Sequence, residues 1–276
     1  MKYEDLILHR VSRQLLDAYM SSPTHALLIS GSRGSGSGTV ARSLVELLVS
    51  HPSDIIVVEP DEKNTISIEI VRELYVWTRD KKVSKQVIII DGADRMSHDA
   101  QHALLKLLEE PNNLTYFIMT AHNPLGLLST IFSRLQHVFL RPLSTVDSLA
   151  MIQKFNKNNS NKSKQVEFLS QGFPAEITRL SNDSDYFIAK SNIVAEARKL
   201  IGGSLFERLA VISRYSKRNE AQELVATLGY IINFMIQKQP SERLYNLAQN
   251  TELAADTLSK NGHVRTQLMR LVINGQ

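Results

Sequence analysis

The sequence has no cysteine among its 276 residues. Disulfides and thiolate zinc sites are therefore excluded, and we expect no structural metal. Long apolar runs are missing too: none approaches the roughly 18 residues of a membrane span. The N-terminus, MKYEDLILHRVSRQLL, is an amphipathic mixture with acids and is unlike a signal peptide. We expect a cytoplasmic protein with no membrane partner.

A large net charge of either sign is also absent. The 32 lysines and arginines against 28 acids give a formal charge of +4 and a pI near 9.2. This excess is far below that of a basic DNA-coating protein, and it suits an ordinary solvated surface better than a nucleic-acid footprint. With 43% hydrophobic residues, the chain has enough material for one to three domains of roughly 100 to 200 residues each.

Short apolar runs alternate with helical patterns from residue 1 to 142. Runs such as DIIVV and QVIII are continuous, as strands covered on both faces require. This alternation predicts an α/β domain with a mostly parallel sheet between helices. The expected strands span 25–30, 54–58, 86–91, 115–121 and 136–140, and the expected helices span 4–20, 38–50, 66–79, 97–109 and 125–131.

Beyond residue 142 the pattern is helical throughout. No further β-branched run appears, and we expect a helical lid domain at 143–184 and an all-α domain at 185–276. The all-α domain should hold four or five helices, with breaks at Gly202-Gly203 and Pro240. The polar stretch KFNKNNSNKSK, 154–164, predicts a loop between two lid helices.

A glycine-rich stretch, GSRGSGSGT, occupies the position of a phosphate-binding P-loop but contains no lysine. The P-loop pattern is Gly, four residues, Gly, Lys and then Ser or Thr, in which the lysine reaches the β and γ phosphates and the hydroxyl holds magnesium. When Gly31 and Gly36 are aligned with the two glycines of the pattern, Ser37 falls on the position of the lysine and Gly38 on the position of the hydroxyl residue. Thr39, which does carry a hydroxyl, lies one residue after that position. Loss of the lysine removes stabilisation of the phosphoryl-transfer transition state.

Two interpretations of this loop remain open. Its glycines, Gly34 among them, lie between a strand and a helix N-terminus, and such a turn can accommodate an anion with or without the lysine. The alternative is a Gly/Ser turn that binds no ligand. Arg33 is a cation within the loop and could substitute for the lysine, although its position belongs to the variable four.

A second catalytic element is also incomplete. In QVIIIDGADRMS, Asp91 ends an apolar strand, where the metal-holding Walker B acid of an ATPase belongs. In ATPases of the AAA+ type the next residue is a glutamate that polarises the attacking water, whereas here it is Gly92. The loss of lysine and glutamate together predicts a chain that does not hydrolyse ATP on its own.

Residues 97–144 resemble the bacterial DNA polymerase III clamp-loader subunits of the delta-prime and gamma/tau family. The stretch reads SHDAQHALLKLLEEPNNLTYFIMTAHNPLGLLSTIFSRLQHVFLRPLS, in which the helix ALLKLLEEP is followed by a sensor strand and a Ser-Arg-Cys-like triplet. The segments HALLISGSRGSGSGTVARSLVELL, HPSDIIVVEP and ISIEIVRELY resemble the family in order and spacing, so the likeness covers about residues 1–180. The C-terminal helices resemble it more weakly, best at 258–274. The resemblance implies an AAA+ domain, a helical lid and an all-α collar that assembles subunits into a ring.

Within that family the sequence is more similar to delta-prime. Gamma/tau-like members carry an intact P-loop and an Asp-Glu pair, whereas delta-prime members often have degenerate ones. The family usually inserts a four-cysteine zinc module before an HPD segment, but here ARSLVELLVS runs directly into HPSD. The resemblance therefore implies that the module is deleted and that no zinc is bound.

The resemblance also assigns roles to individual residues. The family's Ser-Arg-Cys falls on Ser133, Arg134 and a leucine, which makes Arg134 an arginine finger that reaches the γ-phosphate of ATP, with its magnesium, in a neighbouring subunit. The alternative for Arg134 is a surface salt bridge. Thr120 falls on the sensor-1 residue and, with no γ-phosphate to sense, would be a structural hydrogen-bonder. Arg179, in the sensor-2-like GFPAEITRL, would lie over the site of its own chain or, if the loop is empty, clamp the lid to the sheet domain.

The function implied by the resemblance is that of a delta-prime-like clamp-loader subunit in which no cofactor turns over. It would join gamma/tau-like and delta-like subunits, supply Arg134 in trans, and help to load the sliding clamp on primed DNA. Two alternatives are an active gamma-like ATPase with a compensated loop and a DNA-binding AAA+ module outside the loader. The missing lysine and glutamate disfavour the first, and the modest net charge disfavours the second.

Overall fold

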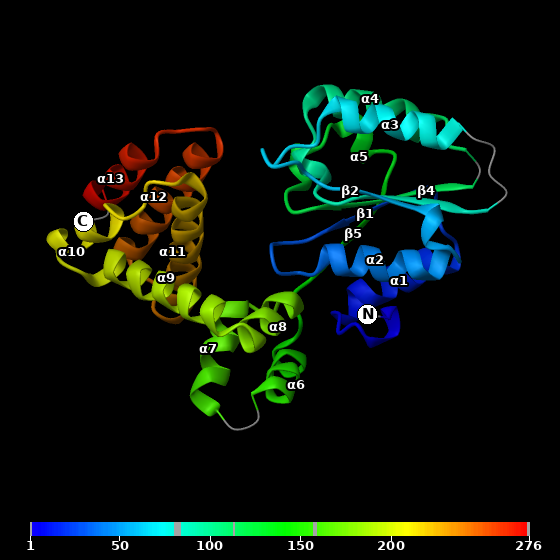
Figure 1. The fold of residues 1–276 in the computed structure, drawn as a ribbon. Helices are drawn as coiled ribbons and strands as arrows, with labels where there is room; N and C mark the ends of the chain where they lie inside the picture. Colours follow the sequence, from blue (N-terminus) through cyan, green and yellow to red (C-terminus); the bar gives the residue numbers. More distant parts are fainter. Residues whose placement is uncertain (1, 80–83, 113, 157–158, 275–276) are drawn as a thin grey trace. The chain divides into compact units, whose positions relative to one another are not determined.

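The computed structural model describes residues 2–79, 84–112, 114–156 and 159–274 (Figure 1). The chain forms two compact units, Met1–Asn182 and Asp183–Gln276. The first unit contains the sheet and the helices around it, and the second is helical. No helix within the described ranges is long and apolar enough to cross a membrane.

The first unit is built on a five-stranded parallel sheet. The strands are β1 (Ala26–Ser30), β2 (Ile55–Val58), β3 (Gln86–Ile90), β4 (Thr115–Ala121) and β5 (Gln136–Phe139). Their order across the sheet is β2-β3-β4-β1-β5, and each neighbouring pair is parallel. Because all carboxyl ends lie at one edge, the residues that follow the strands are brought together there.

Helices cover both faces of this sheet. The covering helices are α1 (Arg10–Ser21), α2 (Ser37–Leu48), α3 (Ile68–Arg79), α4 (His98–Glu109) and α5 (Ser129–Phe132). After β5 come α6 (Thr145–Phe155), α7 (Ser160–Ser170) and α8 (Pro174–Asn182), which pack against one another. Figure 1 shows α1 and α2 on one face and α3, α4 and α5 on the other, with α6 to α8 following the last strand.

Alternate side chains of each strand enter opposite cores. Leu28 and Ile88 pack in the core that α3, α4 and α5 cover, whereas Leu27 and Ile89 pack in the core under α1 and α2. All four side chains are buried. This period of two on a sheet with two covered faces explains why the strands read as uninterrupted apolar runs.

The second unit is a bundle of helices, α9 (Ser184–Gly202), α10 (Leu205–Ile212), α11 (Arg218–Lys238), α12 (Glu242–Ser259) and α13 (Val264–Asn274). Helix α11 packs against α9 and α12, and α13 packs against α10 and α12. Helix α10 begins with a capping box in which the Ser204 backbone N–H donates to the Glu207 carboxylate. This hydrogen bond lowers the pKa of Glu207 below its ordinary value.

Three expected elements differ from the structure. The helix expected over 4–20 is a 3-10 turn at Tyr3–Asp5 followed by α1, because His9 caps α1 by accepting from the Val11 N–H and so starts it later. The helix expected over 125–131 is a 3-10 turn at Pro124–Gly126 followed by α5. There the Leu128 N–H donates to the Gln101 side chain instead of continuing a helix.

The third difference is the loop expected over 154–164, which is longer than the segment that joins α6 to α7 in the structure. Helix α6 runs to Phe155, and α7 begins at Ser160, because Asn159 caps it by accepting from the Lys162 N–H at 2.9 Å. Polar composition indicated a loop, but an asparagine at the N-cap position starts a helix within that stretch. Residues 157–158 of the expected loop lie outside the described residues.

The two-sided burial of the sheet can be tested at Leu28 in β1, which is 0% exposed. Replacement of Leu28 by alanine should lower the free energy of unfolding of the first unit by about 2–5 kcal/mol, because it leaves a cavity in the core. Trp77, the only tryptophan in the sequence, lies in α3, so its fluorescence during urea unfolding reports this unit and not the helical one.

The matched control is Leu125→Ala, because Leu125 is 93% exposed. Its effect should stay within about 0.5 kcal/mol. Equal losses in the two variants would contradict the burial of β1 between two helical layers.

Candidate functional site

The carboxyl edge of the sheet gathers the candidate residues. The glycine-rich loop follows β1, Asp91 follows β3, and Thr120 is the next-to-last residue of β4. Glu59 follows β2, which pairs with β3, so its carboxylate lies at the same edge as that of Asp91. This edge is where parallel α/β sheets bind ligands.

The loop has the backbone of a tight turn that leads into a helix N-terminus. Gly34 and Gly36 have φ angles of 86° and 84°, a left-handed conformation that side chains rarely adopt, and Gly36 is the N-cap of α2. A Cβ at Gly31 would lie 2.7 Å from the Ser35 Oγ, so only glycine fits there. That Ser35 hydroxyl is buried and has no hydrogen-bond partner among the described residues. The shape of a phosphate loop is therefore retained.

Helix α8 lies directly against this loop. The backbone N–H groups of Ala175 and Glu176 both donate to the Gly34 carbonyl, at 3.1 and 3.2 Å. A Cβ at Gly34 would lie 3.2 Å from the Glu176 Oε2, so a carboxylate lies beside the loop. Because like charges repel, this carboxylate opposes the binding of a phosphate at Gly34.

Both carboxylate oxygens of Asp91 have partners. The Thr120 hydroxyl donates to Oδ1 at 2.6 Å and accepts from the Gly92 N–H at 2.9 Å. The Arg42 Nη1 donates to Oδ2 at 3.0 Å, and the Arg42 Nη2 forms an ion pair with Glu59. A single guanidinium from α2 therefore joins the carboxylates that follow β2 and β3.

The ion pair also lies over the first turn of α2. A Cβ at Gly38 would lie 2.9 Å from the Asp91 Oδ2 and 3.2 Å from the Arg42 Nη1. Gly38 is the position at which the P-loop pattern has a magnesium-binding hydroxyl. At the position of the family's catalytic glutamate, Gly92 has a φ of 80°, in which a glutamate would be strained.

These residues do not fit a magnesium-ATP site that turns over. The metal-holding carboxylate is paired with a cation of the chain, and a lysine, a hydroxyl and a glutamate are each replaced by other residues. Within the described ranges, no group of three or more His, Asp or Glu side chains could hold a metal ion.

The remaining loop residues do not complete the site. Arg33 and Thr39 are exposed, whereas Ser37 is buried at the start of α2. Arg33 makes no ion pair with any residue that the structure describes, so it is not brought to Asp91. The sensor-2-like Arg179 lies on α8, in the turn after Glu176, and is exposed.

Arg134 lies away from the loop, in the turn after α5. Its Nη2 pairs with the Glu109 Oε1 at 2.7 Å, and its Nη1 donates to the Thr130 carbonyl at 2.7 Å. The Ser133 hydroxyl donates to the same carbonyl at 3.1 Å. The Arg134 side chain is 36% exposed and that of Glu109 is 48% exposed. In the free chain Arg134 therefore makes a surface salt bridge, as one of its two interpretations expects.

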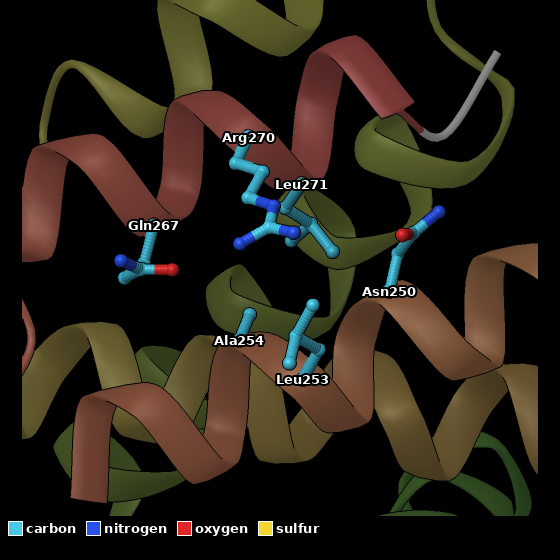
Figure 2. A pocket seen from close by; sticks show the side chains of 6 residues that line it. All are labelled: Asn250, Leu253, Ala254, Gln267, Arg270 and Leu271. Carbon is cyan, nitrogen blue, oxygen red and sulfur yellow. The ribbon is translucent and has the colours of Figure 1, made fainter. Parts of the chain in front are cut away.

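Two hollows lie outside this edge of the sheet. A groove of about 660 Å³ between α3 and α4 is lined by charges of both signs, among them Arg72, Asp99 and Lys106. Figure 2 shows the second hollow, where Leu253 on α12 faces Arg270 and Leu271 on α13. No part of this hollow is wide enough to hold a water molecule, so it is not a ligand pocket.

Four charged residues of these sites were missed by the sequence analysis. Arg42, Glu59 and Glu176 surround the loop, and Glu109 holds Arg134. Glu59 could have been found, because it follows the strand DIIVV as Asp91 follows QVIII, and carboxyl ends of parallel strands share an edge.

The link between Thr120 and Asp91 can be tested by a change of one side chain. Thr120→Val keeps the shape of this 2% exposed residue but removes the acceptor of the Gly92 N–H and the donor to Asp91. We expect a loss of about 1–3 kcal/mol of unfolding free energy, because a buried N–H is left unpaired. The measurement is urea unfolding followed by Trp77 fluorescence.

Thr120→Ser is the matched control, because it keeps the hydroxyl and removes one methyl group. It should cost no more than about 1 kcal/mol. A valine variant as stable as the serine variant would show that the hydrogen bonds do not hold this edge together.

The comparisons with known proteins begin with a family model described as "DNA polymerase III, delta subunit". It matches residues 49–144. This range contains Asp91, Thr120 and Arg134 but starts after the glycine-rich loop.

Two curated relatives show how far the likeness extends. The chain is 26% identical over 230 residues to the DNA polymerase III subunit delta' of Yersinia pestis, covering 79% of this chain and 66% of that protein. It is 24% identical over 205 residues to a replication factor C small subunit of Aeropyrum pernix, covering 73% of this chain and 60% of that protein. The chain thus spans less than two thirds of the length of either relative.

Among solved structures, a DNA polymerase III gamma subunit-related protein of Thermotoga maritima aligns with a TM-score of 0.63. The alignment covers 95% of this chain and 97% of that one at 16% sequence identity. At this identity the likeness shows the fold alone, which is that of an AAA+ parallel-sheet domain with a small helical lid and an all-α C-terminal region. By sequence, the chain is similar to the delta-prime subunits of bacterial DNA polymerase III, and by fold to a gamma subunit-related protein.

Proposed function

We propose that the chain is a delta-prime-like subunit of a DNA polymerase III clamp loader, without ATPase activity of its own. It presents Arg134 to the ATP site of an adjacent gamma/tau-like subunit. In the cytoplasm it joins gamma/tau-like and delta-like subunits, and the assembled ring loads the sliding clamp on primed DNA.

The observation that carries this proposal is that the glycine-rich loop lacks the side chains with which an ATPase binds phosphate and magnesium, and that Asp91 already has a partner. Asp91 is paired with Arg42, and Ser37 and Gly38 stand at the lysine and hydroxyl positions. A phosphoryl-transfer site needs a lysine and a metal ion to neutralise the charge that develops on the phosphate oxygens. A chain whose loop has no lysine and whose Asp91 is paired with Arg42 contributes to ATP hydrolysis only through a neighbouring site.

The surroundings of Arg134 suit a role in trans. Its salt bridge with Glu109 lies at the surface, and pairs of this kind contribute at most about 1 kcal/mol. A γ-phosphate carries more charge than one carboxylate and accepts the planar guanidinium in a bidentate manner. Arg134 can therefore exchange Glu109 for a neighbour's phosphate at little cost in stability.

The isolated chain should release no phosphate from ATP. We would titrate it with a fluorescent ATP analogue and magnesium and then assay the same sample for phosphate release. Absence of both binding and release supports an empty loop, and binding without release makes nucleotide a structural ligand and leaves the proposed role intact. Release that is abolished by Arg33→Ala would overturn the proposal and favour an active gamma-like ATPase.

The DNA-binding alternative has its own readout. Affinity of the isolated chain for DNA, with a steep decrease as salt rises, would favour a nucleic-acid-binding AAA+ module outside the loader. Weak binding with a shallow salt dependence is the result that the proposed function expects.

Arg134→Ala should lower ATP turnover of a complex reconstituted with a gamma/tau-like ATPase. The expected decrease is about 10³- to 10⁵-fold if this arginine completes the transition-state charge balance. Complex formation, checked by size-exclusion chromatography, should be unchanged, because among the described residues the side chain makes one exposed ion pair, with Glu109, and one hydrogen bond, to the Thr130 carbonyl.

Arg214→Ala is the matched control. Arg214 also pairs with a single carboxylate, that of Glu196, but lies in the second unit and is 65% exposed. Turnover should be unchanged in this variant. If both variants leave turnover intact while the complex assembles, Arg134 is not the finger.

A further inference from the structure

Three charges meet where β2 and β3 end. The Arg42 guanidinium pairs with Asp91 through Nη1, at 3.0 Å, and with Glu59 through Nη2. The two carboxylates belong to neighbouring parallel strands, and the arginine comes from the second turn of α2. One cation of the chain therefore pairs with two acids at the place where an ATPase holds magnesium.

We infer that Arg42 is a built-in substitute for the divalent cation: its guanidinium occupies the metal position at Asp91 and keeps this edge of the sheet closed to magnesium. Removal of Arg42 should expose a divalent-cation site made by Asp91 and Glu59. The inference deepens the inactive-site part of the proposed function and rests on it, but it does not depend on Arg134 or on any partner.

The position of Gly38 shows what lies around the ion pair of Arg42 and Asp91. In the P-loop pattern the residue at this position carries the hydroxyl that binds magnesium. Here a Cβ at Gly38 would meet the Asp91 Oδ2 at 2.9 Å and the Arg42 Nη1 at 3.2 Å. The ion pair thus fills the space that a hydroxyl side chain and its metal ion would need.

Charge, rather than access, is what closes the site. The side chains of Arg42 and Glu59 are 45% and 58% exposed, and that of Asp91 is 28% exposed, so a hydrated ion can reach them. Magnesium binds proteins through one or two carboxylates and keeps several of its waters, and Asp91 and Glu59 are two such carboxylates. With Arg42 between them, a dication must displace a guanidinium from both acids and is repelled by its charge.

The test is a titration with Mn²⁺, which binds the same oxygen ligands as magnesium and has an electron paramagnetic resonance signal that is lost on binding. It is performed on the full chain without nucleotide. Arg42→Ala should bind Mn²⁺ at least about tenfold more tightly than the unmodified chain. Arg42→Lys, which keeps a cation at this place, should remain as weak a binder as the unmodified chain.

Two further variants locate the effect. Arg214→Ala makes the same change in net charge in the second unit, where Arg214 pairs with one carboxylate, and should not raise Mn²⁺ affinity. In the Arg42→Ala background, Asp91→Asn should remove the gained affinity. Trp77 fluorescence checks that each variant is folded, and Arg42→Gln replaces Arg42→Ala if the alanine variant is not.

The inference is overturned if Arg42→Ala or Arg42→Gln binds Mn²⁺ no more tightly than the unmodified chain. It is also overturned if the unmodified chain already binds Mn²⁺ with an affinity that Asp91→Asn abolishes. Neither result involves ATP turnover or a partner subunit, so a failure here is distinguishable from a failure of the proposed function.

Discussion

The Asp91 carboxylate, at the end of β3, links β3 to β4 and to α2 in the first unit. Its carboxylate accepts the Thr120 hydroxyl from β4, pairs with Arg42 from α2, and lies against Gly38 at the start of that helix. The strand, the loop helix and the sensor strand are thereby held at one edge of a parallel sheet. Both oxygens of Asp91 are therefore used within the chain, one by a hydroxyl from β4 and the other by a guanidinium from α2.

The glycine-rich loop shows that a turn can keep the backbone shape of a phosphate loop after the side chains that bind the ligand are lost. Gly34 and Gly36 have positive φ angles, and Gly31 has no room for a Cβ beside Ser35, so the turn from β1 into α2 needs these residues for the fold alone. The lysine and the hydroxyl of the pattern serve only the ligand. A glycine-rich turn after a buried strand is therefore weak evidence for a nucleotide, whereas the charges around it decide what it can bind.

The sequence predicted the sheet better than the helix ends and the charge pairs. Apolar runs located the strands, most clearly β1 and β3, because an inner strand buried on both faces must be largely apolar, whereas the edge strand β5 reads QHVF and is partly exposed. The late start of α1 at Arg10 and the early start of α7 at Ser160 depend on caps by His9 and Asn159, single side chains that periodicity does not detect. Arg42 was missed for another reason: its partners lie 17 and 49 residues away, and only the register of β2 against β3 brings them together.

Arg42 and Arg134, both in the first unit, differ in the number of carboxylates with which each forms ion pairs. Arg42 is held by two carboxylates, one of which, on Asp91, is 28% exposed and also hydrogen-bonded to Thr120. Arg134 is held by one carboxylate, that of Glu109, which is 48% exposed, and by a backbone carbonyl. Removal of Arg42 would leave two acids without this cation, whereas removal of Arg134 would leave one. The arginine whose departure leaves only one acid is the one to which the proposed function assigns a phosphate on a neighbouring subunit.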